Sequence, residues 1–315
     1  MDPLPPATGA ENGESPAPKA QILPHQQNVF EQLLELTQIA TCTQHGCFPI
    51  RPRTSTLVIG PSGSGKTFMP KALQECLGLP LCLVAISDWI LLGCASRGAS
   101  VTWPAIAGFL AKHYTAPGVI IAIDEIDKLS RRTSWEVFIT AEVFALLDLR
   151  IPDNLRDRDD DSSMSETLLE KAKEVLSSRT MIIGMGAFQD IWEERQAPTI
   201  GFQTEDTDSE MPGLRSLAEI VPPELANRFR SQILVLPPLT VGDYHAMLDK
   251  CAQGIPGNFR LRFLAMGRAA IPEAFTNRKG PRFLEELLVD VLIAERREIR
   301  APLPPITTTE DQLTI

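Results

Sequence analysis

The chain has 315 residues, of which 43% are hydrophobic, so it is long enough and apolar enough to bury a substantial core. It carries 30 Lys plus Arg against 40 Asp plus Glu, and the resulting formal charge of −10 argues against bulk affinity for nucleic acid. These figures also exclude a fully disordered chain, a coiled coil and a collagen. No run approaches the roughly 18 apolar residues of a membrane helix. We expect a cytoplasmic protein of mainly α/β class.

The predicted elements begin after a proline-rich tail. Residues 1–21 mix Pro with small and charged residues, which is typical of a disordered tail, and they lack the apolar centre of a secretory signal. A first helix is predicted over Val29–Ile39, where apolar residues recur at helical spacing.

Five short, continuous apolar runs follow, which is the pattern of parallel strands covered on both faces: Thr56–Ile59, Leu81–Ile86, Val119–Ile123, Met181–Met185 and Ile233–Leu236. The segments between them have helical patterns: Lys66–Leu77, Trp103–His113, Ser134–Leu149 and Ser165–Ser177. Regular alternation of strand and helix predicts a doubly wound, five-stranded parallel sheet of the P-loop type. Two polar insertions, Arg150–Met164 and Gln203–Met211, are expected to be surface loops.

The end of the chain has a different pattern. After Pro237–Pro238 no strand is predicted, and three segments have helical spacing: Val241–Cys251, Phe259–Ala270 and Pro281–Ile299. We therefore predict a large α/β domain at 22–238, a small helical lid domain at 239–300 and a tail at 301–315.

A phosphate-binding loop lies between the first predicted strand and the next helix. Its residues match the pattern G-x-x-x-x-G-K-[ST]: Gly60, Pro61, Ser62, Gly63, Ser64, Gly65, Lys66 and Thr67. Glycines allow successive backbone N–H groups to face a triphosphate at a helix N-terminus. Lys66 is expected to bridge the β- and γ-phosphates and the Thr67 hydroxyl to hold Mg²⁺, so the predicted cofactors are ATP and Mg²⁺.

An acidic pair follows the third predicted strand. Asp124 and Glu125 come directly after Val119–Ile123, at the carboxyl edge of the sheet where ligands of open α/β sheets bind. Asp124 is expected to orient Mg²⁺ and its waters. Glu125 is expected to polarise the water that attacks the γ-phosphate, which makes a nucleotide binder into a hydrolase.

These motifs and four further segments together resemble the AAA+ ATPases of the ClpX/HslU branch. The segments are Ile123–Arg132, Gly184–Phe188, Pro223–Arg228 and Lys279–Arg282, and the resemblance covers about residues 25–298. It implies a homo-oligomeric ring, usually of six subunits, in which Arg228 is the arginine finger reaching a neighbour's γ-phosphate. It also implies that Arg282 is the sensor 2 arginine. Read without the family, either arginine could be an ordinary surface residue.

The sequence departs from this family at three places. The family's zinc-binding N-terminal domain is not found, and the three potential ligands in Cys42–Cys47 lack a second cysteine pair, so free thiols are the favoured interpretation. The stretch Gly93–Gly98, which corresponds to the substrate-gripping pore loop, has no aromatic residue. Arg97 there could face an acidic peptide or a nucleic-acid backbone, or have no role. The sensor strand ends at Gly184–Gly186 without a polar side chain, so we expect hydrolysis that is slow or that relies on a backbone group.

Two further segments are assigned by their place in the family pattern. Thr199–Phe202 contains Ile200-Gly201-Phe202 and corresponds to the loop that docks a ClpP-like peptidase; the alternative is that it packs on the body of the domain. Ile22, Leu23 and Gln26 lie where the adenine-contacting segment would be.

Two functions fit the sequence. One is an ATP-driven ring that remodels or threads a protein client, acting as a chaperone and perhaps with a peptidase. The other is an assembly protein that is switched by nucleotide and recruits or regulates a partner without pulling on a polypeptide. One form of this hypothesis places the assembly on DNA. The small size and the pore loop without an aromatic favour the second more than the family name suggests. A binder without turnover is disfavoured by the intact Asp124–Glu125 pair.

Overall fold

The computed structural model describes residues 22–42, 50, 52–95, 101–130, 136–152, 155, 165–189, 192, 221–230 and 232–299. The predicted tails, 1–21 and 301–315, lie outside these ranges. The described chain starts with a short 3-10 helix, η1 (Pro24–Gln26), which leads into α1 (Gln27–Ala40). The first helix is therefore about one turn longer than predicted.

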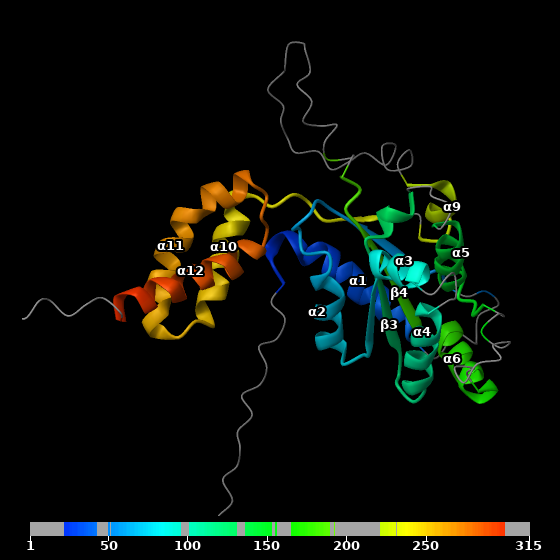
Figure 1. The fold of residues 1–315 in the computed structure, drawn as a ribbon. Helices are drawn as coiled ribbons and strands as arrows, with labels where there is room; N and C mark the ends of the chain where they lie inside the picture. Colours follow the sequence, from blue (N-terminus) through cyan, green and yellow to red (C-terminus); the bar gives the residue numbers. More distant parts are fainter. Residues whose placement is uncertain are drawn as a thin grey trace, which may run out of the picture.

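A five-stranded sheet forms the centre of the large unit, as predicted (Figure 1). All strand pairs are parallel and the order is β2-β3-β4-β1-β5. The strands are β1 (Thr56–Ile59), β2 (Leu81–Ala85), β3 (Val119–Asp124), β4 (Thr180–Gly186) and β5 (Leu234–Val235). The three inner strands are almost wholly buried, whereas β2 is only half-buried because it is an edge strand.

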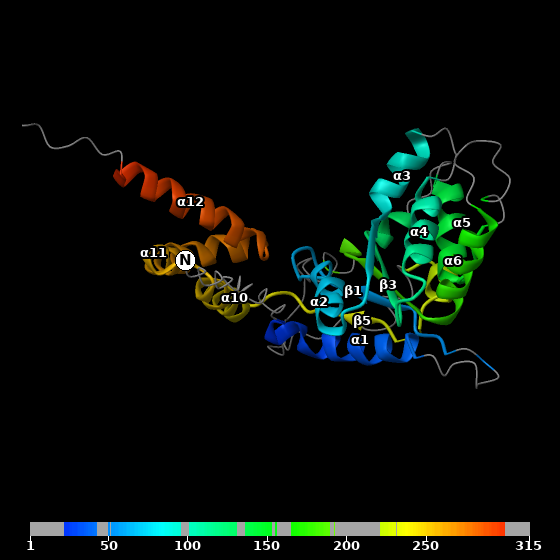
Figure 2. The ribbon, with the colours of Figure 1, turned by 90° about the horizontal axis from the view of Figure 1, so that it is seen from below.

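Helices cover both faces of the sheet, so the doubly wound architecture is confirmed. One face, with Ile120 and Ala122, packs against α1 and α2 (Phe68–Leu77). Alternate residues of the same strand, such as Ile121 and Ile123, point to the opposite face. That face is covered by α3 (Ile86–Ala95), α4 (Thr102–Lys112), α5 (Glu136–Leu147) and α6 (Glu166–Ser178). Figure 2 shows α1 on one side of the sheet and α3 to α6 on the other.

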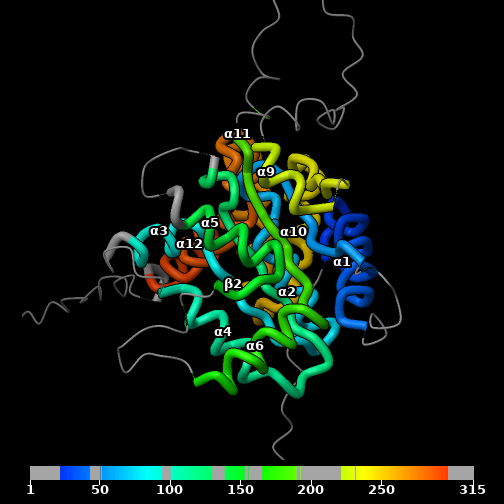
Figure 3. The backbone as a smooth tube through the Cα atoms, turned by 90° about the vertical axis from the view of Figure 1, so that its right-hand side faces the viewer, coloured from blue at the N-terminus to red at the C-terminus, as the bar shows by residue number. Residues whose placement is uncertain are grey.

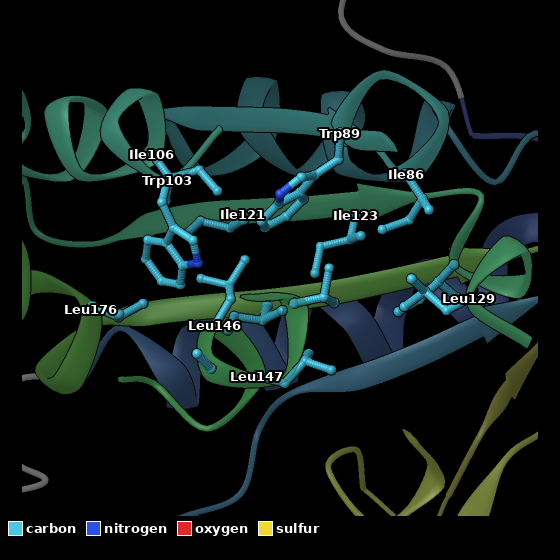
Figure 4. Close-up of a cluster of buried hydrophobic side chains, with 14 of the residues drawn as sticks. Ile86, Trp89, Trp103, Ile106, Ile121, Ile123, Leu129, Leu146, Leu147 and Leu176 are labelled. Carbon is cyan, nitrogen blue, oxygen red and sulfur yellow. The ribbon is translucent and has the colours of Figure 1, made fainter. Parts of the chain in front are cut away.

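Helix α3 is a difference from the prediction. The apolar run Leu81–Ile86 predicts one strand, but the strand ends at Ala85 and Ile86 already belongs to α3. The helix is held to the core by Trp89, which is 1% exposed and donates its indole N–H to Glu142 Oε2 at 2.7 Å. Trp103 of α4 donates to the Glu142 carbonyl at 3.2 Å, and Figure 4 shows both indoles within one apolar cluster. Tertiary packing of Trp89 therefore stabilises this segment against the core as a helix.

Three helices make up the C-terminal unit: α10 (Val241–Gln253), α11 (Gly257–Thr276) and α12 (Arg282–Ile299). They share a separate apolar core that includes Tyr244 and Phe263. Helix α11 extends further than Phe259–Ala270 at both ends and continues through Pro272. In Figure 3 this unit lies behind the sheet, and Figure 2 shows it at the end opposite α4 to α6. Among the described residues, no helix combines the length and apolar character needed to cross a membrane.

Candidate functional site

The phosphate loop, Gly60–Thr67, connects β1 to α2 at the carboxyl edge of the sheet. Gly63 and Gly65 have φ of 80° and 90°, the left-handed region that glycine adopts without a steric cost. Lys66 is 9% exposed, and its Nζ donates to the carbonyls of Gly60 at 2.8 Å and Pro61 at 2.9 Å. Burial lowers the pKa of Lys66, although Asp124 and Asp127 act in the opposite direction. The ammonium is thus held within the concavity of the loop.

Thr67 and Asp124 meet as the motifs predict. Thr67 Oγ1 donates to Asp124 Oδ2 at 2.7 Å, and Asp124 Oδ1 accepts from the backbone N–H of Glu125 at 2.8 Å. A hydroxyl beside a carboxylate is a set of hard oxygen donors that fits Mg²⁺ together with phosphate oxygens. Ser64 Oγ is buried without a hydrogen-bond partner among the described residues, so the loop has an unused polar group that fits an anionic ligand.

Glu125 follows β3 in a left-handed conformation, with φ of 58°. Such a φ is uncommon for a residue with a side chain and is frequent at functional sites. Its Oε2 accepts from Lys128 Nζ at 2.7 Å and from the hydroxyl of Ser87. The hydrogen bond from Lys128 lowers the pKa of Glu125 most, and the hydrogen bond from Ser87 lowers it further. The carboxylate therefore stays ionised at a lower pH than an ordinary glutamate. Neither Ser87 nor Lys128 was predicted. Ser87 is the second residue of α3, just after the end of β2, and Ala85 of β2 pairs with Asp124 at the same edge of the sheet.

The segment before α1 contacts the phosphate loop directly. Gln26 is 2% exposed and donates its amide to the Ser64 carbonyl at 3.2 Å. His25 Nε2 lies 3.3 Å from the same oxygen, and His25 Nδ1 lies 3.4 Å from Asp243 of α10. Of the predicted adenine contacts, Gln26 therefore reaches the loop, while Leu23 packs on the C-terminal core. His25 is an addition that sequence reasoning missed.

The turn before α12 lies against the phosphate loop. Gly280 has φ of 58°, and a Cβ placed there would lie 2.7 Å from Gly63 Cα, so the two main chains are in close contact. Tyr244 of α10 fixes this turn, since its hydroxyl accepts from the Gly280 N–H at 3.0 Å. Arg282 is the first residue of α12, just beyond this contact, and its side chain is exposed.

Arg228 lies elsewhere, after the short helix α9 (Pro223–Ala226). Its Nε is 3.1 Å from Asp148 Oδ1, and its Nη1 donates to the Glu224 carbonyl at 2.6 Å. Its guanidinium lies over the ring of Phe144 at 4.0 Å. The contacts described for Arg228 are thus with α5 and α9, which lie side by side in Figure 1 at the end of the large unit remote from α10 to α12.

The sensor strand β4 has no room for a polar side chain at its end. A Cβ at Gly184 would lie 2.6 Å from Phe229, and one at Gly186 would lie 2.5 Å from Phe188. The polar contact there comes from Asp127, whose Oδ1 accepts the backbone N–H of Ala187 at 3.2 Å. Packing by aromatic side chains therefore accounts for the small residues of this strand.

Several predicted features fall wholly or partly outside the described residues. The docking segment 199–202, the acidic insertion 203–211 and Arg97 are among them. Of the predicted pore loop, the described residues Gly93–Ala95 belong to α3 rather than to a loop, because the helix continues past Leu92. Cys42 is an exposed free thiol, and among the described residues no group of three or more His, Cys, Asp or Glu side chains is arranged to hold a metal ion.

Comparison with known families agrees with this geometry. Residues 56–195 match the family described as "ATPase family associated with various cellular activities (AAA)". The matched segment runs from β1 past the end of β4 and contains the phosphate loop and Asp124–Glu125. It indicates an ATPase, which is a hydrolase, and AAA ATPases use ATP with Mg²⁺. No curated protein matches the chain.

Proposed function

We propose that the protein is a ClpX-like AAA+ ATPase whose sites are completed between the subunits of a ring-like oligomer, and whose hydrolysis remodels a macromolecular client. One observation carries this proposal. Lys66, Thr67 and Asp124 converge within one chain, whereas Arg228 is held beside α5 and α9, which Figure 1 shows on the side of the large unit remote from α10 to α12. A cation so placed suits the nucleotide of a neighbouring subunit.

Each residue of the site has a proposed role. Backbone N–H groups of Gly60–Thr67 bind the phosphates, Lys66 contributes charge, and Thr67 with Asp124 holds Mg²⁺, which would neutralise charge on the phosphate oxygens. Glu125 accepts a proton from the attacking water, and its lowered pKa keeps it ionised for this task. Arg282 is proposed to contact phosphate from the C-terminal unit, which acts as a lid.

A second function is favoured by a specific observation on α3. The only aromatic residue of this helix, Trp89, is buried against Glu142, whereas the exposed side chains near Gly93 are Leu91 and Leu92. An aromatic side chain free to push on a polypeptide is therefore missing from the described part of this segment. This supports a nucleotide-switched assembly or regulatory ATPase that acts with a partner complex without unfolding a protein. One form of this proposal places the partner complex on DNA.

Mixing two inactive variants tests the shared site. Arg228→Ala subunits keep Glu125, and Glu125→Gln subunits keep Arg228, so each pure variant should have little turnover. An equimolar mixture should regain ATP hydrolysis, because a Glu125→Gln subunit supplies Arg228 to its Arg228→Ala neighbour. Full activity of pure Arg228→Ala, or a mixture that stays inactive, would reject the proposal.

The two functions differ in their response to clients. A remodelling ring should, with ATP, abolish the fluorescence of a tagged folded substrate. A switched assembly protein should leave that fluorescence unchanged while a partner or DNA alters its ATP hydrolysis. If DNA acts through phosphate contacts, its effect should weaken as salt is raised.

A further inference from the structure

We propose that Phe144 and Asp148 are positioning residues for Arg228, and that they orient its guanidinium toward the nucleotide of the neighbouring subunit. This inference rests on the proposed function, because it takes Arg228 as the group that completes the neighbour's site. It adds Phe144 of α5 and Asp148, the residue directly after this helix, which neither the motifs nor the family resemblance indicates.

The backbone on both sides of this contact is fixed. Phe144 lies in α5 and Asp148 follows one turn later, with the Asp148 N–H donating to the Phe144 carbonyl at 2.8 Å, so both side chains share a face. The Arg228 N–H donates to the Leu225 carbonyl at 3.1 Å, and the next residue, Phe229, is 2% exposed in the core. The base of the Arg228 side chain is therefore anchored, and its tip needs a separate restraint.

Three contacts restrain that tip from different directions. Asp148 accepts from Nε, the Glu224 carbonyl accepts from Nη1, and the ring of Phe144 supports one face of the guanidinium at 4.0 Å. The other terminal nitrogen, Nη2, has no acceptor among the residues that the structure describes. The arrangement leaves the outer N–H groups available for an anion, which is the geometry that phosphate recognition by arginine requires.

A role in stability alone is a weak explanation for this arrangement. The Arg228 side chain is 27% exposed and that of Asp148 is 47% exposed. Ion pairs at such sites contribute little because water screens them and long side chains lose freedom. An arginine that must act on a neighbour gains more, because a side chain ordered beforehand does not have to be ordered when the subunits meet.

The mixing experiment can separate positioning from stability by where the substitution is placed. Asp148→Ala is added either to the Glu125→Gln subunit, which donates Arg228, or to the Arg228→Ala subunit, which donates the catalytic site. When Asp148→Ala is in the Arg228 donor, we expect kcat of the mixture to fall about three- to tenfold, because one side chain must then be ordered when the subunits meet. KM for ATP should be unchanged. In the site donor we expect no change.

Two variants and one control sharpen the test. Asp148→Asn keeps an acceptor oxygen for Nε and should recover part of the lost rate. Phe144→Leu removes the ring face but stays apolar, and it should reproduce the loss in the Arg228 donor only. Asp249→Asn disrupts the exposed pair of Asp249 with Arg268 on the C-terminal unit and should have no effect in either subunit.

The outcomes are distinguishable. A loss confined to the Arg228 donor supports the positioning role. An equal loss in both subunits, no loss, or a gain overturns the positioning role while the shared site stands. If the parent mixture without these substitutions is inactive, the proposed function fails and the positioning role fails with it.

Discussion

The two ends of the large unit hold their charged groups in different ways. At the phosphate-loop end, the functional side chains bind one another: Thr67 donates to Asp124, and Glu125 accepts from Ser87 and Lys128. At the other end, Arg228 is held by Phe144, Asp148 and Glu224. None of these three residues belongs to the phosphate-binding site of the same chain. A site assembled within one chain can be tested by single substitutions. A group proposed to act on a neighbouring subunit is tested by mixing two variants of the protein.

The largest effect is expected at the self-contained end. Glu125→Gln removes the proposed base but keeps a side chain of the same shape, so turnover should fall about 10²- to 10⁴-fold. Binding of ATP should be retained, because the phosphate loop is untouched. Steady-state phosphate release and a nucleotide titration measure the two quantities, and Glu174→Gln, at an exposed position of α6, is the matched control. Normal turnover by Glu125→Gln would remove Glu125 from the chemistry.

Lys66→Ala should weaken ATP binding by about ten- to a hundredfold, the range of hydrogen bonds to charged groups. The substitution also leaves the carbonyls of Gly60 and Pro61 without their buried donor. Lys71→Ala changes an exposed lysine of the neighbouring helix α2 and should bind ATP normally. If the two variants have equal affinity in a titration, Lys66 does not contact the nucleotide.

Gly184 of β4 packs against the residue that follows Arg228, so substituting it should change the stability of the large unit. A Cβ at Gly184 would meet Phe229, which adjoins Arg228, so Gly184→Ala should lower the free energy of unfolding by about 1–3 kcal/mol. Gly108→Ala in α4 meets nothing within 4 Å and should stabilise the protein by about 0.5–1 kcal/mol. Denaturant unfolding compares the two variants. A Gly184→Ala protein as stable as the Gly108→Ala protein would show that Phe229 can move freely.

The smallest effect concerns pH. The pKa of Glu125 is held below its usual range chiefly by Lys128 and secondly by Ser87, so the carboxylate should stay ionised as the pH falls. Lys128→Met should raise that pKa and shift the acid limb of the kcat profile to higher pH, and Ser87→Ala should do so to a smaller extent. A limb that stays in place or moves to lower pH in Lys128→Met would contradict the assignment.

Local patterns in the sequence were sufficient for the central sheet and the phosphate loop. Strands β1, β3 and β4 are continuous apolar runs, and the loop is a contiguous motif, so each could be predicted from a short window. Helix α3 could not be predicted in this way, because Ile86 continues the apolar run of β2, and the helix is held by contacts distant in sequence, such as that of Trp89 with Glu142.

The partners of the site residues were missed for a similar reason. Ser87 and Glu125 are 38 residues apart in sequence, and Asp148 and Arg228 are 80 apart. Their contacts depend on where the sheet brings its strand ends and on how α9 packs against α5. A motif fixes which residue carries the charge, but the packing of distant elements decides what surrounds it.

The contact between Gly63 and Gly280 has a mechanical consequence. Two stretches of main chain meet there without an intervening side chain that could rotate aside. The helical unit therefore cannot move closer to the phosphate loop at this point unless one of the two main chains shifts. If hydrolysis of ATP moves the phosphate loop toward the turn before α12, the displacement would pass directly from one main chain to the other.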